Sequence, residues 1–166
     1  MCLGALPIAT ASVALPLPHR YRVTAVAGPE GELAVDGSGL EPLRVMPPAE
    51  FGGPGGYWSP ETMLTGAVST CFLLTFRAIA RARAVPWVSL DCDVEGVLDR
   101  EQGTSRFTEF VVRARLSVPE GTDVAAADHA LYLAEQRCLV SNSLTGRCRL
   151  EASVEVEDLR DVAFLP

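Results

Sequence analysis

The sequence is poor in the side chains that most often hold a metal ion. It has only two histidines, His19 and His129, and none of its five cysteines forms a CxxC pair or lies at zinc-ligand spacing from a histidine. We therefore expect no metal and no bound cofactor. An odd number of cysteines in a chain of 166 residues also argues against a secreted disulfide scaffold and favours a reducing, cytoplasmic compartment.

Positive charge is also scarce. The 14 Lys and Arg residues face 21 Asp and Glu residues, which gives a net charge of −7. The basic residues are scattered, and their only local group is Arg77, Arg81 and Arg83. An acidic chain of this kind excludes nucleic acid and anionic membranes as the main partners.

The first 18 residues are apolar but lack the features of a signal peptide. No Lys or Arg precedes Arg20, so a positively charged n-region is missing. Three prolines interrupt the segment, which is also too short to span a bilayer. We expect an N-terminal arm over residues 1–18 and a single domain over residues 19–166.

The rest of the chain has the pattern of an α+β domain. Hydrophobic residues make up 48% and charged residues 21%, as in a globular protein with a packed core. Alternating apolar and polar positions predict strands, and longer runs without proline predict helices. The predicted order is β-β-β-α-β-β-α-β, with strands over 20–27, 32–35, 43–46, 88–98, 106–118 and 147–156, helices over 61–84 and 124–137, and a loop over 100–105.

The first predicted helix has a well-marked start. Ser59 is a suitable N-cap, Pro60 fits the first helical position, and Glu61 favours the positive end of the helix dipole. Apolar side chains then cover most of the circumference, which predicts a helix enclosed by protein on all sides.

Four of the five cysteines fall in predicted elements or at their ends. Cys92 and Cys148 share the parity of the buried faces of their strands, so we expect them to be small core residues. Cys71 lies in the middle of the first helix, and Cys138 directly follows the second. These two would meet if the helices packed side by side, but their spacing alone leaves a buried structural role and a reactive role both open.

A set of motifs links these cysteines to a known family. The stretch Gly52–Gly53, the triplet Ser59–Pro60–Glu61, Cys71 and the later CLVSN segment that starts at Cys138 resemble the OsmC/Ohr superfamily of thiol peroxidases. The resemblance implies an OsmC-like fold that forms an intertwined homodimer, with long central helices packed against antiparallel sheets. It also implies that Cys71 is the peroxidatic cysteine and Cys138 the resolving cysteine.

The activity implied by the resemblance is the reduction of organic hydroperoxides in oxidative stress defence, with a lipoyl-type or small dithiol as the reductant. The resemblance also gives Glu61 an activating role. Ten residues along a helix is about 15 Å of rise, so Glu61 would act across the dimer on the Cys71 of the partner subunit. The alternative is that Glu61 only stabilises the helix N-terminus.

One expected residue of the family is missing. The Ohr branch has an arginine in the first hairpin turn, where this chain has Pro29 and Glu30. Because burial raises a thiol pKa, we expect a substitute cation, for which Arg20, Arg22 and Arg44 are the candidates. The same absence keeps two other functions open, a non-catalytic small-molecule-binding protein and a cysteine redox sensor.

Overall fold

The computed structural model describes residues 16–158, so Cys2 and most of the predicted N-terminal arm lie outside the described residues. The chain divides into two compact units, Met1–Arg44 and Val45–Pro166. The domain boundary that we placed at residue 18 stays a prediction.

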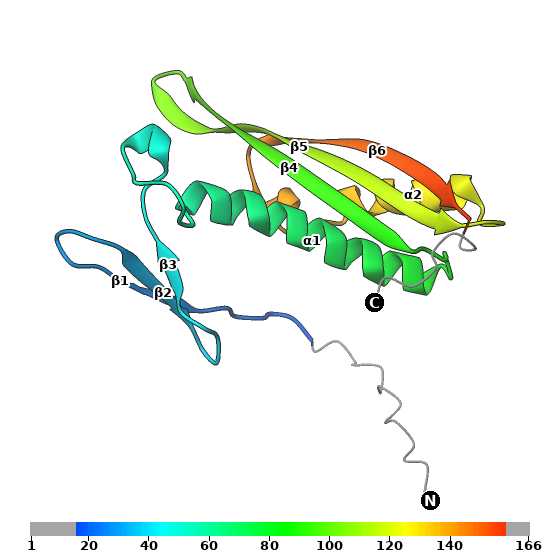
Figure 1. The fold of residues 1–166 in the computed structure, drawn as a ribbon, viewed down its shortest axis with the longest axis horizontal. Helices are drawn as coiled ribbons and strands as arrows, with labels where there is room; N and C mark the ends of the chain where they lie inside the picture. Colours follow the sequence, from blue (N-terminus) through cyan, green and yellow to red (C-terminus); the bar gives the residue numbers. More distant parts are fainter. Residues whose placement is uncertain (1–15, 159–166) are drawn as a thin grey trace, which may run out of the picture. The chain divides into compact units, whose positions relative to one another are not determined.

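The first unit carries most of a three-stranded sheet. Its strands follow the order β1-β2-β3 and have the bounds Val23–Val26, Leu33–Gly37 and Leu43–Val45 (Figure 1). β1 and β2 form the predicted antiparallel hairpin, with Val23 opposite Gly37. On this sheet Arg44 donates through Nε to Glu32 at 2.8 Å.

The second unit places two helices on one face of a second three-stranded sheet, in which the strand order is β4-β5-β6 (Figure 1). α1 contacts β4, and α2 lies beside α1 against β5 and β6. The predicted α+β order is confirmed, with α1 Pro60–Ala82, β4 Ser89–Glu101, β5 Thr104–Pro119, α2 Val124–Gln136, β6 Arg147–Glu157 and the short 3-10 turns η1 Ala49–Phe51 and η2 Ser141–Ser143.

The expectation of purely antiparallel sheets is wrong for the second unit. β4 and β5 are antiparallel, but β5 and β6 are parallel from the pair Glu109–Arg147 to the pair Pro119–Glu157. Parallel neighbours need a crossover connection. α2 and the segment after it provide this connection, because they return the chain along the sheet before β6 begins.

The predicted loop over 100–105 is also wrong. β4 and β5 stay paired as far as Glu101 and Thr104, which leaves only Gln102 and Gly103 in the turn. Both have positive φ values, 51° and 83°. Two-residue turns with positive φ match the twist of paired strands, so the hairpin continues to its tip.

α1 begins at Pro60, the residue expected at the first helical position and one residue before the predicted range of 61–84. The Ser59 hydroxyl accepts a hydrogen bond from the Thr62 N–H at 3.2 Å, and the Thr62 hydroxyl accepts one from the Ser59 N–H at 2.8 Å. This reciprocal cap satisfies two donors that the first turn would otherwise leave free. The helix ends at Ala82, two residues before the predicted end, and Ala84 takes a positive φ of 51° that no helix can continue.

The core lies between the two helices and the β4-β5-β6 sheet. Val68, Phe72 and Phe76 of α1 are at most 1% exposed and belong to the same buried cluster as Phe110 and Leu131. By length and composition α1 would also span a bilayer, as core helices of soluble proteins often would. We interpret it as a core helix because this face is buried in the sheet and helix layer.

The opposite face of α1 is not enclosed within one chain. Leu74 is 61% exposed, and Thr70 and Arg77 are also exposed. The single chain therefore does not by itself provide the cover predicted for all sides of this helix.

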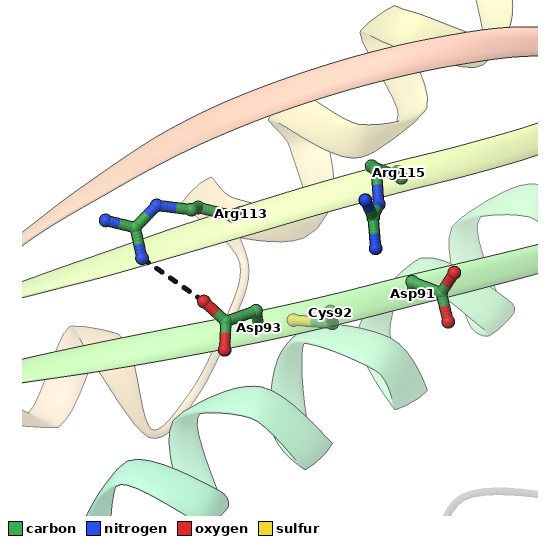
Figure 2. Close-up of a pocket in the computed structure, with 5 residues that line it drawn as sticks. All are labelled: Asp91, Cys92, Asp93, Arg113 and Arg115. Carbon is green, nitrogen blue, oxygen red and sulfur yellow. Dashed lines mark hydrogen bonds and ion pairs between the residues drawn. The ribbon is translucent and has the colours of Figure 1, made fainter.

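The outer face of the β4-β5-β6 sheet is charged, as the alternation predicts. Arg113 of β5 donates to Asp93 at 3.2 Å and to Glu95 at 2.7 Å, both on β4. Figure 2 shows Arg113 and Arg115 of β5 above Asp91 and Asp93 of β4, which all line a pocket of about 620 Å³. Exposed pairs of this kind contribute little to stability, and we assign no chemistry to them.

Candidate functional site

The structure brings the two predicted reactive cysteines together. Cys71 lies in the middle of α1 and is half-buried, whereas Cys138 directly follows α2 and is 1% exposed. Both are free thiols, and their side chains are hydrogen-bonded to each other. Because α1 and α2 pack side by side, Cys71 and Cys138 are therefore neighbours in the fold.

A tight turn after α2 shapes the site around Cys71. The Asn142 N–H donates to the Cys138 carbonyl at 3.0 Å, and the Asn142 side-chain amide donates to the Gln136 carbonyl at 3.0 Å. These two bonds close the chain back on the end of α2. The turn thereby holds the N–H groups of Leu139 and Val140 against the Cys71 sulfur.

The pKa of Cys71 is lowered although the thiol is partly buried. Burial raises this pKa, but four hydrogen-bond donors outweigh it: the Val140 N–H, the Cys138 thiol, the Leu139 N–H and the Thr75 hydroxyl. Each donor stabilises the thiolate more than the thiol. The expectation that only a cation can lower the pKa of this residue is wrong.

The pKa of Cys138 moves in the opposite direction. Burial raises it, the hydroxyl and N–H of Ser141 offset part of that rise, and the neighbouring Cys71 raises it again. Of the two thiols, Cys71 therefore loses its proton more readily, and the Cys138 thiol can donate a hydrogen bond to it. A thiolate at Cys71 can attack an oxidant, and the neighbouring Cys138 can then form a disulfide with the oxidised sulfur once it has lost its own proton.

Sequence reasoning missed the donors around Cys71. Thr75 lies four residues after Cys71, which puts the two on one helix face, so the sequence held a signal for it. The N–H groups of Leu139 and Val140 carried no such signal, because they reach Cys71 only through the packing of α1 beside α2.

The three candidate arginines belong to the first unit, whereas Cys71 belongs to the second. Arg44 forms an ion pair with Glu32 on its own sheet, and Arg20 and Arg22 are exposed. Their part in the site stays a prediction.

Glu61 lies at the start of α1, away from the Cys71 of its own chain. It lines a cavity of about 350 Å³ together with Glu50, Phe51 and Phe107. Its Oε2 atom is buried and has no hydrogen-bond partner among residues 16–158. A buried carboxylate oxygen without a partner is costly, so this atom calls for a donor from elsewhere.

The other described cysteines occupy the expected core positions. Cys92 and Cys148 are half-buried and pack against the core cluster. Burial raises the pKa of Cys92, which makes its thiol less reactive than that of Cys71. Among the residues that the structure describes, no group of His, Cys, Asp and Glu side chains has an arrangement that would hold a metal ion.

Comparison with known proteins identifies this architecture. The profile of the family described as OsmC-like protein matches residues 53–153. The uncharacterized protein YmaD of Bacillus subtilis is 27% identical over 143 residues, which cover 83% of this chain and 95% of that protein. The chain belongs to the OsmC-like family.

Solved structures show the same fold at low sequence identity. An OsmC-like protein of unknown function from Vibrio cholerae superposes with a TM-score of 0.75 at 16% identity, covering 82% of this chain and all (100%) of that one. An organic hydroperoxide resistance protein from Legionella pneumophila gives 0.65 at 23% identity, covering 83% and 98%. The family thus contains proteins described by hydroperoxide resistance and proteins without an assigned activity.

Replacing Thr75 by valine tests the origin of the lowered pKa. The change keeps the shape of the side chain and removes one donor to the Cys71 thiolate, so the pKa of Cys71 should rise. In the wild type we expect the midpoint of Cys71 alkylation by iodoacetamide against pH to lie below that of an unperturbed cysteine thiol. In Thr75→Val it should move up, and the rate at pH 7 should fall roughly 3- to 10-fold.

Thr70→Val is the matched control on the same helix, because the Thr70 hydroxyl donates to the Gly66 carbonyl at 2.8 Å and not to a thiol. Peptide mass spectrometry separates alkylation of Cys71 from that of the other cysteines. An unchanged midpoint in Thr75→Val, or an equal shift in Thr70→Val, would remove Thr75 from the site.

Proposed function

We propose that this protein is a cytoplasmic thiol peroxidase that reduces organic hydroperoxides in oxidative stress defence. Cys71 is the peroxidatic residue and Cys138 the resolving residue. The observation that supports this most strongly is the contact between a thiol of lowered pKa, Cys71, and a thiol of raised pKa, Cys138.

The proposed reaction begins with the Cys71 thiolate attacking the terminal oxygen of the hydroperoxide. The S–O bond forms as the O–O bond breaks, and the alkoxide takes a proton and leaves as an alcohol. Cys71 is now a sulfenic acid. The Cys138 thiol attacks its sulfur, water leaves with the proton of Cys138, and a Cys71–Cys138 disulfide remains.

An external dithiol, lipoyl-type or small, completes the proposed cycle. Its first thiolate attacks Cys71, the half-buried and more accessible of the two sulfurs, and Cys138 leaves as a thiol. The second thiol of the reductant then displaces Cys71. The reductant leaves as a cyclic disulfide, and both protein thiols are restored.

A homodimer would explain two features that a single chain leaves open. It would cover the exposed face of α1 around Leu74, and it would bring a donor to the buried Oε2 of Glu61. In this arrangement Glu61 activates the site of the partner subunit rather than its own, about 15 Å along the helix. Arg20, Arg22 and Arg44 remain candidates for the cation that pairs with it.

Two other functions on the same scaffold follow from the missing hairpin arginine at Pro29 and Glu30. One is a small-molecule-binding protein without turnover, and the other is a redox sensor in which the Cys71–Cys138 disulfide is itself the signal. Under a continuous supply of peroxide and reductant, each of these two functions predicts a response that differs from that of a peroxidase.

Steady-state consumption of cumene hydroperoxide with a dithiol reductant distinguishes the three candidate functions: peroxidase, redox sensor and binding protein. A peroxidase consumes many equivalents per chain, because reduction regenerates Cys71. A sensor consumes about one equivalent and then stops until it is slowly reduced, and a binding protein consumes none. Either of these last two results would refute the proposed activity.

A further inference from the structure

Another cavity of the second unit, of about 250 Å³, is lined by residues of α1 and of the end of α2. Its lining is Thr75, Ala78, Ile79, Ala82, Arg83 and Arg137. Thr75 donates to Cys71, and Arg137 immediately precedes Cys138, so the cavity borders the site from both helices. The proposed peroxidase cycle makes no use of its far end.

The two arginines come from different helix ends. Arg83 is the C-cap residue of α1 and Arg137 the C-cap residue of α2. Both are exposed, and no ion pair within residues 16–158 involves either of them. Basic residues are the minority in this chain, 14 against 21 acidic ones, and two of them line this one cavity.

A favourable interaction with the helix dipole explains why an arginine stands at each helix end, but not why both line one cavity. The backbone N–H groups of the two cap residues do not contribute to anion binding in this cavity. The N–H groups of Arg83 and Arg137 already donate to carbonyls within their own helices, and helix C-termini repel negative charge. Any anion bound in this cavity therefore depends on the two guanidinium groups.

The wall between these charges and Cys71 is apolar and small. Ile79 is 6% exposed, and Ala78 and Ala82 add short side chains beside it. Twelve residues separate Cys71 from Arg83, about 18 Å of helix rise before the length of the arginine side chain is subtracted. A ligand that reached both ends would need a charged head, an apolar stem and a reactive tail.

We propose that this cavity binds the carboxylate of a medium-length organic acid whose other end reaches Cys71. Guanidinium groups match carboxylates in charge and in bidentate geometry, and the apolar wall suits a hydrocarbon stem. The inference rests on the proposed function for the identity of the reactive tail. The tail is either a hydroperoxide or a dithiol, and the carboxylate is common to both.

Octanoate alone tests the carboxylate site without any turnover, by isothermal titration calorimetry on the full chain. We expect octanoate to bind the wild type and to bind at least about tenfold more weakly to Arg83→Gln and to Arg137→Gln, since each loses a charge-assisted hydrogen bond. Arg81→Gln is the matched control, because it removes the same charge from the last turn of α1 outside the cavity lining. Absence of octanoate binding, or equal loss in all three variants, would overturn the inference whatever the peroxidase assay shows.

Steady-state kinetics then show whether the bound carboxylate belongs to the dithiol reductant or to the hydroperoxide substrate. Dihydrolipoate is compared with its uncharged amide, and a hydroperoxide of an alkanoic acid with its methyl ester. In Arg137→Gln the KM for one of the two carboxylates should rise about tenfold, with kcat and the KM of the uncharged analogue little changed. A shift for dihydrolipoate assigns the cavity to the reductant, and a shift for the hydroperoxide of the alkanoic acid assigns it to the substrate. No shift in either would contradict the proposal.

Discussion

Replacing Cys71 by serine is expected to reduce hydroperoxide consumption to the rate of the reagents without protein. The hydroxyl of serine is far too weak an acid to be ionised by the N–H groups of Leu139 and Val140, so the attacking group is lost. The measurement is peroxide consumption with a dithiol, at equal concentrations of wild type and variant. Circular dichroism of both proteins shows that the fold is retained.

Two further variants make this result specific. Cys148→Ala removes a half-buried thiol outside the pair and should leave the rate near that of the wild type. Cys138→Ser should still consume the first equivalent of peroxide, because Cys71 remains, but should leave a sulfenic acid that a dimedone probe traps. A Cys71→Ser protein with wild-type turnover would exclude Cys71 as the peroxidatic residue.

Placing a charge at Leu74 is expected to break the homodimer. Leu74 is 61% exposed on the face of α1 that the single chain leaves uncovered. If a second subunit covers this face, Leu74→Glu buries an unpaired carboxylate at the interface, at a cost of about 3 kcal/mol or more. The dissociation constant should rise roughly a hundredfold or more. Sedimentation velocity should then show a dimer for the wild type and a 17.7 kDa species for the variant.

Val124→Glu is the control for this change. Val124 is 43% exposed at the first turn of α2, where a carboxylate is favourable for the helix. This variant should remain dimeric and active. A monomeric wild type would contradict the dimer and the role of Glu61 across it, and a Leu74→Glu monomer with full activity would contradict that role alone.

The pattern of residues predicted most of the second unit because its elements obey local rules. Ser59 and Pro60 fix the start of α1, and the alternation over β4 and β5 separates the core from the charged face. The parallel pairing of β6 was missed because strand direction depends on the path of the connection, which leaves no trace in the alternation of β6 itself.

The candidate site was also predicted only in part. Cys71 and Cys138 were predicted from the motifs that resemble the OsmC/Ohr superfamily, because their spacing alone left a structural role open. The lowered pKa of Cys71 was not predicted, because two of the four donors that lower it are backbone N–H groups. Every residue except proline has such a group, so composition cannot single out Val140. Only the packing of the turn after α2 onto α1 gives Leu139 and Val140 their role.

Peptide mapping after one equivalent of an organic hydroperoxide tests the central claim, that Cys71 and Cys138 form one redox pair. The account predicts loss of two free thiols per chain and a single new disulfide that joins the peptides of Cys71 and Cys138, with Cys92 and Cys148 still alkylated as free thiols. Recovery of all five thiols, or a disulfide that does not contain Cys71, would contradict it.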